Sequence, residues 1–166
     1  QGGGVILDFA HELDYIRWFF GDPKEVFCWS DKVSDLEIDT EDTAAILLKF
    51  PSRMVAQVQL DYLQHTYRRG MEIIGQKGTI VWDFTAQTVQ LFGPDNNQHQ
   101  VWQENINSEL NSMYIEEMEH FVRCIEGSEK PMVDAQDGRA VVELAVAAQL
   151  SSREGRVVRL PLEDPE

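Results

Sequence analysis

The stretch that decides the fold is TAAILLKFPSRMVAQVQLDYL, residues Thr43–Leu63. Its two apolar runs, Thr43–Phe50 and Arg53–Leu63, alternate with a period of two, which is typical of β-strands with one buried face. Pro51-Ser52 turns the chain between them, and so short a connection favours antiparallel pairing. The residues expected on the buried face are Ala44, Ile46, Leu48 and Phe50 in the first run, and Met54, Ala56, Val58, Leu60 and Tyr62 in the second.

Further strands and helices are predicted on both sides of this pair. Gly75-Gln76-Lys77-Gly78 joins two short apolar runs as a glycine-containing hairpin turn. Gly93–Ser112 is polar and aperiodic, and is expected to be either a long loop or a hairpin extension. The predicted strands are Glu25–Val33, Met71–Ile74, Thr79–Phe84, Thr88–Phe92 and an edge strand Val157–Leu160, and the predicted helices are Val5–Phe20, Met113–Ile125 and Gln136–Arg153, the last with Asp134 or Asp137 as N-cap.

This order of elements predicts an α+β fold, a mostly antiparallel open β-sheet with helices packed on one face. The strand around Ala44–Phe50 also carries Ala45 and Leu47 on its other face. Because a large exposed apolar patch is unusual on a monomer, a second subunit packed sheet to sheet, in a homodimer or tetramer, is the expected cover. A sheet with core on both faces is the alternative.

The composition is that of one acidic globular domain over residues 1–166. Lys and Arg number 14 against 29 Asp and Glu, so the formal charge is −15, which argues against binding to nucleic acid or to an anionic membrane surface. No apolar run approaches the ~20 residues that a membrane span needs. Acids are concentrated between Gly21 and Asp42, so Ser34–Asp42 is expected to be a solvated connector.

The two cysteines, Cys28 and Cys124, share no short motif and predict neither a zinc site nor a redox pair. Two reduced, buried thiols in a cytoplasmic protein are what we expect. The run His-Glu-Leu-Asp-Tyr in the first helix lacks the second histidine of a zinc-protease helix, so no metal is expected there either.

The first predicted helix is apolar except for one polar stripe. At ~100° per residue, Asp8, His11, Glu12 and Tyr15 fall within about a quarter-turn of one another, with Asp14 just beyond. A carboxylate beside a histidine stabilises the charged ring and orients it, which suits acid–base catalysis. A solvated or structural histidine is the alternative.

The run Gly2-Gly3-Gly4, Asp8, His11 and Asp14, followed by an aromatic-rich stretch ending at Gly21, resembles the start of the C-terminal domain of the Gfo/Idh/MocA oxidoreductases. The resemblance covers nearly the whole chain. The other stretches that look like that domain are Asp61–Gln64, Arg68–Asp83, Glu126–Pro131 and Asp134–Gly138.

The resemblance implies an NAD(P)-dependent oxidoreductase acting on a sugar, a sugar derivative such as a nucleotide sugar, or a polyol. In that family a Rossmann domain comes first, binds NAD or NADP and supplies a catalytic lysine, whereas this chain contains no Gly-x-Gly-x-x-Gly. The chain is therefore expected to be the substrate-binding and oligomerisation domain, joined to the missing half at its glycine-rich start and inactive alone. The same resemblance makes His11 the catalytic acid–base and Asp8 the residue that orients the substrate.

One spacing departs from the family pattern, which has three residues between the aspartate and the histidine. This chain has two, Phe9 and Ala10. The difference amounts to about 100° around a helix, so Asp8 and His11 can both keep the family's positions only through a local distortion.

Candidate substrate contacts are Asp14 and Tyr15 on the first helix, Tyr62 at the end of a strand, and Arg68 and Arg69 after it. The arginines can hold a phosphate or carboxylate of the substrate, or be two solvated side chains on a turn. A hypothesis from a different class is a non-catalytic ligand-binding or dimerisation protein of the same fold.

Overall fold

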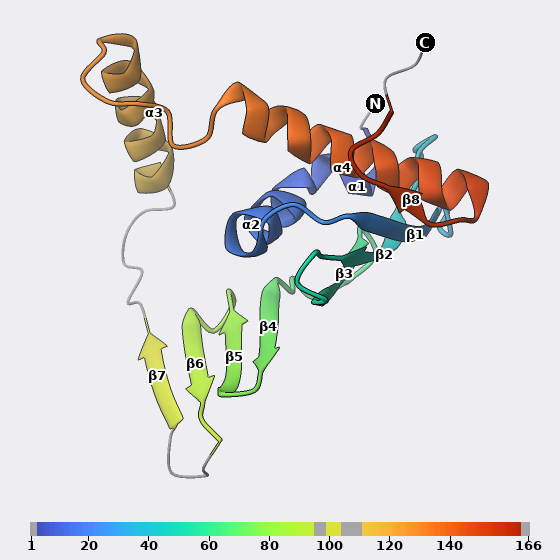
Figure 1. Ribbon diagram of the computed structural model, residues 1–166, viewed down its shortest axis with the longest axis horizontal. Coiled ribbons are helices and arrows are strands. Elements are labelled where there is room, and N and C mark those ends of the chain that lie inside the picture. The colour runs from blue at the N-terminus through green and yellow to red at the C-terminus, as the bar shows by residue number, and fades with distance from the viewer. Residues whose placement is uncertain (1–2, 95–98, 104–110, 164–166) are drawn as a thin grey trace. The chain divides into compact units, whose positions relative to one another are not determined.

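The computed structural model describes residues 3–94, 99–103 and 111–163. Its contacts divide the chain into two compact units, one of Gln1–Leu63 with Met132–Glu166 and one of Gln64–Pro131. Each unit contains a four-stranded antiparallel sheet, and Figure 1 labels the strands and helices along the chain. The predicted α+β class with antiparallel strands is therefore confirmed. That both units belong to one domain over residues 1–166 stays a prediction.

The sheet of the first unit confirms the alternation predicted for Thr43–Leu63. Within it, Ala44 lies opposite Leu60 and Ile46 lies opposite Val58, and all four side chains are buried. Residues of the other face, such as Leu47, are exposed. The strands, in the order in which they pair, are β3 (Val55–Asp61), β2 (Thr43–Lys49), β1 (Glu25–Asp31) and β8 (Val158–Arg159).

Helices cover the buried face of this sheet. The long helix α4 (Ala135–Glu154) packs along β1, and the short helix α1 (Val5–Asp8) packs on β2 and β3. Two serines of α4 fix the position of the helix along β1. Ser151 Oγ accepts from the Cys28 N–H at 3.0 Å, and Ser152 Oγ accepts from the Ser30 N–H at 2.9 Å. Helix α2 (Ala10–Phe20) packs on α4, so the first helices and the last one share one core.

The prediction of a single first helix over Val5–Phe20 is wrong. Helix α1 ends at Asp8 and α2 begins at Ala10, because Phe9 leaves the helical conformation with φ −107° and ψ 29°. The carbonyl of Phe9 accepts from the Glu12 N–H at 2.9 Å and so starts the new helix. Neither proline nor glycine marks this interruption, which is why the hydrophobic period does not predict it.

The second unit carries its own sheet and one helix. Gly75 faces Gly78 across a two-residue turn, as predicted, and a Cβ at Gly78 would lie 2.4 Å from the Phe92 carbonyl oxygen. The strand at residues 99–103 pairs with Thr88–Phe92, which is the hairpin extension considered for Gly93–Ser112; residues 95–98 and 104–110 lie outside the described ones. The strands are β4 (Gly70–Gly75), β5 (Gly78–Asp83), β6 (Thr88–Phe92) and β7 (His99–Gln103), and the helix is α3 (Asn111–Ile125).

The acidic connector before β2 is only partly the solvated loop that its charge predicts. Asp42 at its end is fully buried. Its carboxylate accepts from the N–H groups of Val33 and Ser34 at 2.9 and 3.0 Å and from the Ser34 hydroxyl at 2.6 Å. These hydrogen bonds, that from the Ser34 hydroxyl foremost, hold the pKa of Asp42 below its ordinary range. Asp42 therefore holds the start of the connector, at Val33 and Ser34, next to its end.

No helix in the described parts of the chain is both long enough and apolar enough to cross a membrane.

Candidate functional site

The predicted site residues Asp8 and Tyr62 meet where α1 and β3 end. The Tyr62 hydroxyl donates to Oδ2 of Asp8 at 2.5 Å, and the Tyr62 N–H donates to the Asp42 carbonyl at 3.0 Å. Asp8 is the last residue of α1, and its exposed carboxylate also accepts from the Gly3 N–H at 3.4 Å. The tyrosine is thus fixed through its backbone, and it fixes the aspartate.

The environment of Tyr62 keeps its phenol protonated. Burial raises the pKa of Tyr62 well above its ordinary value, and the hydrogen bond to Asp8 and the negative charges of Asp8 and Glu41 raise it further. At neutral pH the phenol is consequently a hydrogen-bond donor, unsuited to removing a proton from a substrate. Tyr62 is therefore not a candidate for an acid–base role.

His11 is the side chain that can take that role. It stands on the first turn of α2 with its side chain 52% exposed, and its Nε2 is 3.2 Å from Oε1 of Glu12. The Phe9 ring meets the rings of both His11 and Tyr62 edge-on, with centroids 5.9 and 5.6 Å apart. Phe9 therefore connects the histidine to the Asp8–Tyr62 pair.

The interruption at Phe9 lies between Asp8 and His11, which is where the short spacing of this chain requires a distortion. Phe9 ends one helix and starts the next. Asp8 and His11 accordingly belong to separate helices. The rotation of 100° per residue around one continuous helix therefore does not relate their positions. The polar stripe predicted for one continuous helix is corrected in this respect.

Glu41 is a neighbour of this site that the sequence did not single out. Gly4 has φ 85°, and a Cβ there would lie 2.4 Å from the Glu41 carboxylate. The Val5 N–H donates to the Glu41 carbonyl at 3.0 Å, and the negative charge of Glu41 helps to raise the pKa of Tyr62. The only signal in the sequence was the acid pair Glu41-Asp42 just before a strand.

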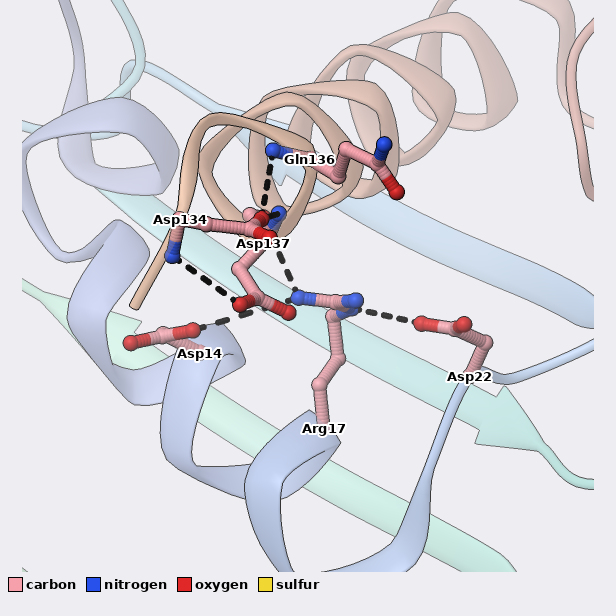
Figure 2. Close-up of polar contacts among 6 residues, drawn as sticks. All are labelled: Asp14, Arg17, Asp22, Asp134, Gln136 and Asp137. Carbon is pink, nitrogen blue, oxygen red and sulfur yellow. Dashed lines mark hydrogen bonds and ion pairs between the residues drawn. The ribbon is translucent and has the colours of Figure 1, made fainter. Parts of the chain in front are cut away.

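Asp14 lies at a different place, among the polar contacts of Arg17, one of which joins α2 to α4 (Figure 2). Oδ1 of Asp14 is 3.9 Å from Nη1 of Arg17, which also donates to the Asp137 carbonyl at 3.2 Å. The Arg17 Nε donates to Asp22 at 2.7 Å, and the Arg17 side chain is only 10% exposed. These contacts give Asp14 a structural environment. The other predicted residue of α2, Tyr15, is partly buried and packs against the core.

Arg68 and Arg69 belong to the second unit. Arg68 is exposed, whereas Arg69 is partly buried with its guanidinium carbon 5.7 and 5.6 Å from the ring centroids of Trp82 and Phe84. Stacking on two aromatic rings is a stabilising position for a guanidinium. Of the two predicted anion contacts, Arg68 is the one presented to solvent.

Within residues 3–94, 99–103 and 111–163, no three or more His, Cys, Asp or Glu side chains gather in a way that could hold a metal ion.

Known proteins resemble this chain in sequence and in fold. It is 28% identical over 165 residues to myo-inositol 2-dehydrogenase from Thermotoga maritima, covering 95% of this chain and 49% of that protein. The WlbA dehydrogenase from Bordetella pertussis, solved in complex with NADH and UDP-GlcNAcA, has a TM-score of 0.76 at 19% identity over 97% of this chain and 49% of that one. UDP-N-acetylglucosamine 3-dehydrogenase GnnA from Acidithiobacillus ferrooxidans has a TM-score of 0.74 at 21% identity over 90% and 47%.

The chain thus spans about half the length of the proteins that it matches. The solved structures show that the fold is shared. The family model described as "Oxidoreductase family, C-terminal alpha/beta domain" matches residues 1–160. The chain therefore belongs to the Gfo/Idh/MocA oxidoreductase family, as the resemblance of its sequence implied, and corresponds to the C-terminal domain.

Proposed function

We propose that this chain is the substrate-binding and oligomerisation domain of an NAD(P)-dependent dehydrogenase that acts on a sugar, a sugar derivative or a polyol. Membership in the family and the relatives' activities on myo-inositol and on a UDP-sugar support the substrate class. The observation that carries the proposal is the Asp8–Tyr62 hydrogen bond beside the exposed His11. This hydrogen bond fixes the Asp8 carboxylate three residues before the histidine.

His11 is proposed to accept the proton of the hydroxyl group that is oxidised, at Nδ1. The Glu12 carboxylate, 3.2 Å from Nε2, takes the N–H of the neutral ring and stabilises the imidazolium that results. Asp8, held by Tyr62, has lone pairs left to accept a hydrogen bond from a second hydroxyl and so to orient the sugar. NAD or NADP, when bound, supplies the hydride acceptor. This chain lacks the phosphate-binding Gly-x-Gly-x-x-Gly, so holding the dinucleotide is assigned mainly to another domain.

The test is a dehydrogenase assay of the full-length protein with NAD and NADP against polyols, aldoses and UDP-sugars. His11→Asn is expected to lower kcat by roughly 10²- to 10⁴-fold, the usual contribution of a general base. Its matched control is His99→Asn, since His99 is an exposed histidine of the second unit, stacked on Phe92. Equal kcat values for the two variants would rule out the proposed role of His11.

The isolated chain is expected to show no dehydrogenase activity and no tight binding of NADH. A titration followed by NADH fluorescence measures this directly. The alternative function, a non-catalytic ligand-binding or dimerisation protein, predicts that the full-length protein also fails to oxidise any sugar or polyol. Sugar binding without turnover in the full-length protein would favour that alternative.

Oligomerisation is proposed to use the outer face of the first unit's sheet. Trp29 is 77% exposed there, Val55 63% and Leu47 44%, which is an unusual apolar surface for a monomer. A homodimer or tetramer that packs these faces together would bury it. Leu47→Lys should shift the sedimentation coefficient toward the monomer, and an unchanged coefficient would argue against this interface.

The remaining residues proposed to bind the substrate are Asp14, Tyr15, Tyr62, Arg68 and Arg69, of which Tyr62 acts through Asp8. Exposure makes Arg68 the one suited to a phosphate. Arg68→Gln should raise KM for a UDP-sugar and leave KM for an uncharged polyol unchanged. We further propose a cytoplasmic protein, which fits the two free thiols.

A further inference from the structure

A cluster of four polar side chains lies at the end of α3, outside the site described above. The Cys124 Sγ is 3.5 Å from Nε2 of His120, one helical turn earlier. Nδ1 of the same ring is 2.6 Å from Oε2 of Glu129, and the other oxygen of Glu129 accepts from Nε of Arg123 at 2.7 Å. Thiol, imidazole, carboxylate and guanidinium thus form one connected chain.

The turn after the helix holds this arrangement. Gly127, with φ 75°, ends α3, and its N–H donates to the Cys124 carbonyl at 3.1 Å. The N–H groups of Ser128 and Glu129 both donate to the Arg123 carbonyl, at 3.0 and 3.3 Å. This turn brings Glu129 back beside His120. The cluster is therefore made by ten consecutive residues, 120–129, and needs no distant segment.

The carboxylate determines which nitrogen of His120 carries the proton. The hydrogen bond from His120, and next that from Arg123, hold the pKa of Glu129 below its ordinary value, so the carboxylate is charged at neutral pH. A charged carboxylate 2.6 Å from Nδ1 takes the N–H of a neutral ring as its donor. Nε2 is then the acceptor, and it faces the thiol of Cys124.

We propose that Cys124 is a nucleophilic thiol that reacts with small disulfides, with His120 as its base and Glu129 as the residue that orients the ring. The thiol proton passes to Nε2, and the sulfur attacks one sulfur of the disulfide. The S–S bond of the reagent breaks, and the leaving thiolate takes the proton from the imidazolium. The products are a mixed disulfide at Cys124 and one small thiol.

The environment of the two cysteines directs the reaction to Cys124. Cys124 is partly exposed, whereas Cys28 is fully buried in the first unit and burial raises the pKa of its thiol to about 11. Glu129 and Arg123 are charged groups beside the Cys124–His120 pair, and Glu119 lies 3.6 Å from the same arginine. Arg123 offsets these acids, so the pair is not in a purely negative field.

The test exposes the full-length protein to an uncharged dipyridyl disulfide and follows the released thiol by absorbance, with intact mass to locate the adduct. The reference is the same protein unfolded in urea, whose thiols are ordinary ones. At pH 7 an ordinary thiol is roughly 3% thiolate. A neighbouring base raises the reaction rate by removing the thiol proton, and part of this increase is lost because the sulfur becomes less nucleophilic. Native Cys124 is therefore expected to react about tenfold faster than the unfolded reference.

Three variants complete the test. Cys124→Ser should abolish the fast reaction, and His120→Asn should slow it to the rate of the unfolded chain and give it the pH profile of a free thiol. Glu119→Gln is the matched control, because that acid contacts Arg123 and belongs to the same helix. A native thiol that reacts no faster than the unfolded one, or a His120→Asn variant with unchanged rate and pH profile, would overturn the proposal.

Discussion

The hydroxyl of Tyr62 and the carboxylate of Asp8 lie 2.5 Å apart and join two segments that are 54 residues apart in the sequence. Tyr62 is fixed by its own N–H on the Asp42 carbonyl, so the aspartate is the partner that gains order. A fixed carboxylate beside an exposed histidine is what makes this end of the sheet a candidate site.

Tyr62→Phe should lower kcat/KM of the full-length dehydrogenase by about tenfold, because a net hydrogen bond to a charged group contributes roughly 1.5 kcal/mol or more. The phenylalanine ring keeps the edge contact with Phe9. Since Tyr62 acts through Asp8, the double variant with Asp8→Asn should lose no more than Asp8→Asn alone. Steady-state kinetics of the four proteins measures this.

Tyr114→Phe is the control for that experiment, because Tyr114 is an exposed tyrosine on α3. It should leave kcat/KM unchanged. Losses from Tyr62→Phe and Asp8→Asn that simply add would contradict a shared role.

Replacing Arg17 by Met should lower the free energy of unfolding by about 1–2 kcal/mol. Arg17 is nearly buried and bonds both Asp22 and the Asp137 carbonyl, so it ties α2 to the start of α4 (Figure 2). The estimate is kept low because Asp14 and Asp22 remain 40% and 71% exposed and are partly screened by water. Urea unfolding with an unchanged m-value is the measurement.

The control for Arg17 is Lys49→Met, which removes an ion pair of similar length to Glu25 with a lysine that is 60% exposed. Exposed pairs of this kind contribute at most about 1 kcal/mol. If the two variants lose the same stability, burial of Arg17 is not what makes its contacts matter.

Local patterns predicted the sheets well and the site only in part. Alternation in Thr43–Leu63 and the Gly75–Gly78 turn depend on neighbours in sequence, and both are present. The pairing of Asp8 with Tyr62 was not foreseen, although both residues were singled out, because it depends on where α1 meets β3. The break at Phe9 has no proline or glycine to announce it.

Charge was the least reliable guide. Asp42 belongs to an acidic run that predicts solvation, yet three donors from Val33 and Ser34 satisfy its carboxylate in the interior. Asp14 stays a proposed substrate contact, and the sequence pattern did not indicate that its carboxylate lies 3.9 Å from Nη1 of Arg17. A charged residue can be buried where the folded chain brings donors to it, for Asp42 from the start of the same connector, and such donors cannot be read from a run of acids.

Asp42→Asn should destabilise the protein at pH 7 and matter less in acid. An aspartate carboxyl ordinarily titrates near 3.8, and the folded protein holds the pKa of Asp42 below that. The stabilisation is therefore present above about pH 4 and is lost as pH falls through the lower folded value. Thermal unfolding of both proteins should give Tm curves that converge below pH 4. Asp35→Asn, an exposed acid of the same connector, should not change Tm at either pH.

Gly4→Ala should destabilise the protein more than Gly21→Ala does. Both glycines have positive φ, 85° and 78°, with extended ψ, a region that side chains avoid at a cost of about 1–3 kcal/mol. The Cβ at Gly21 would meet nothing within 4 Å, so that variant measures backbone strain alone. The Cβ at Gly4 would also lie 2.4 Å from the Glu41 carboxylate.

The second cost at Gly4 is steric and can be separated from the first. Adding Glu41→Ala removes the carboxylate, so the double variant should lose less stability than the two single variants summed, by about 1 kcal/mol. The negative charge of Glu41 also acts on Tyr62. Displacement of this carboxylate in Gly4→Ala should therefore lower kcat/KM of the full-length enzyme. Gly21→Ala should leave kcat/KM unchanged. Strict additivity of the unfolding free energies would mean that Glu41 moves aside freely and that Gly4 is needed only for its backbone conformation.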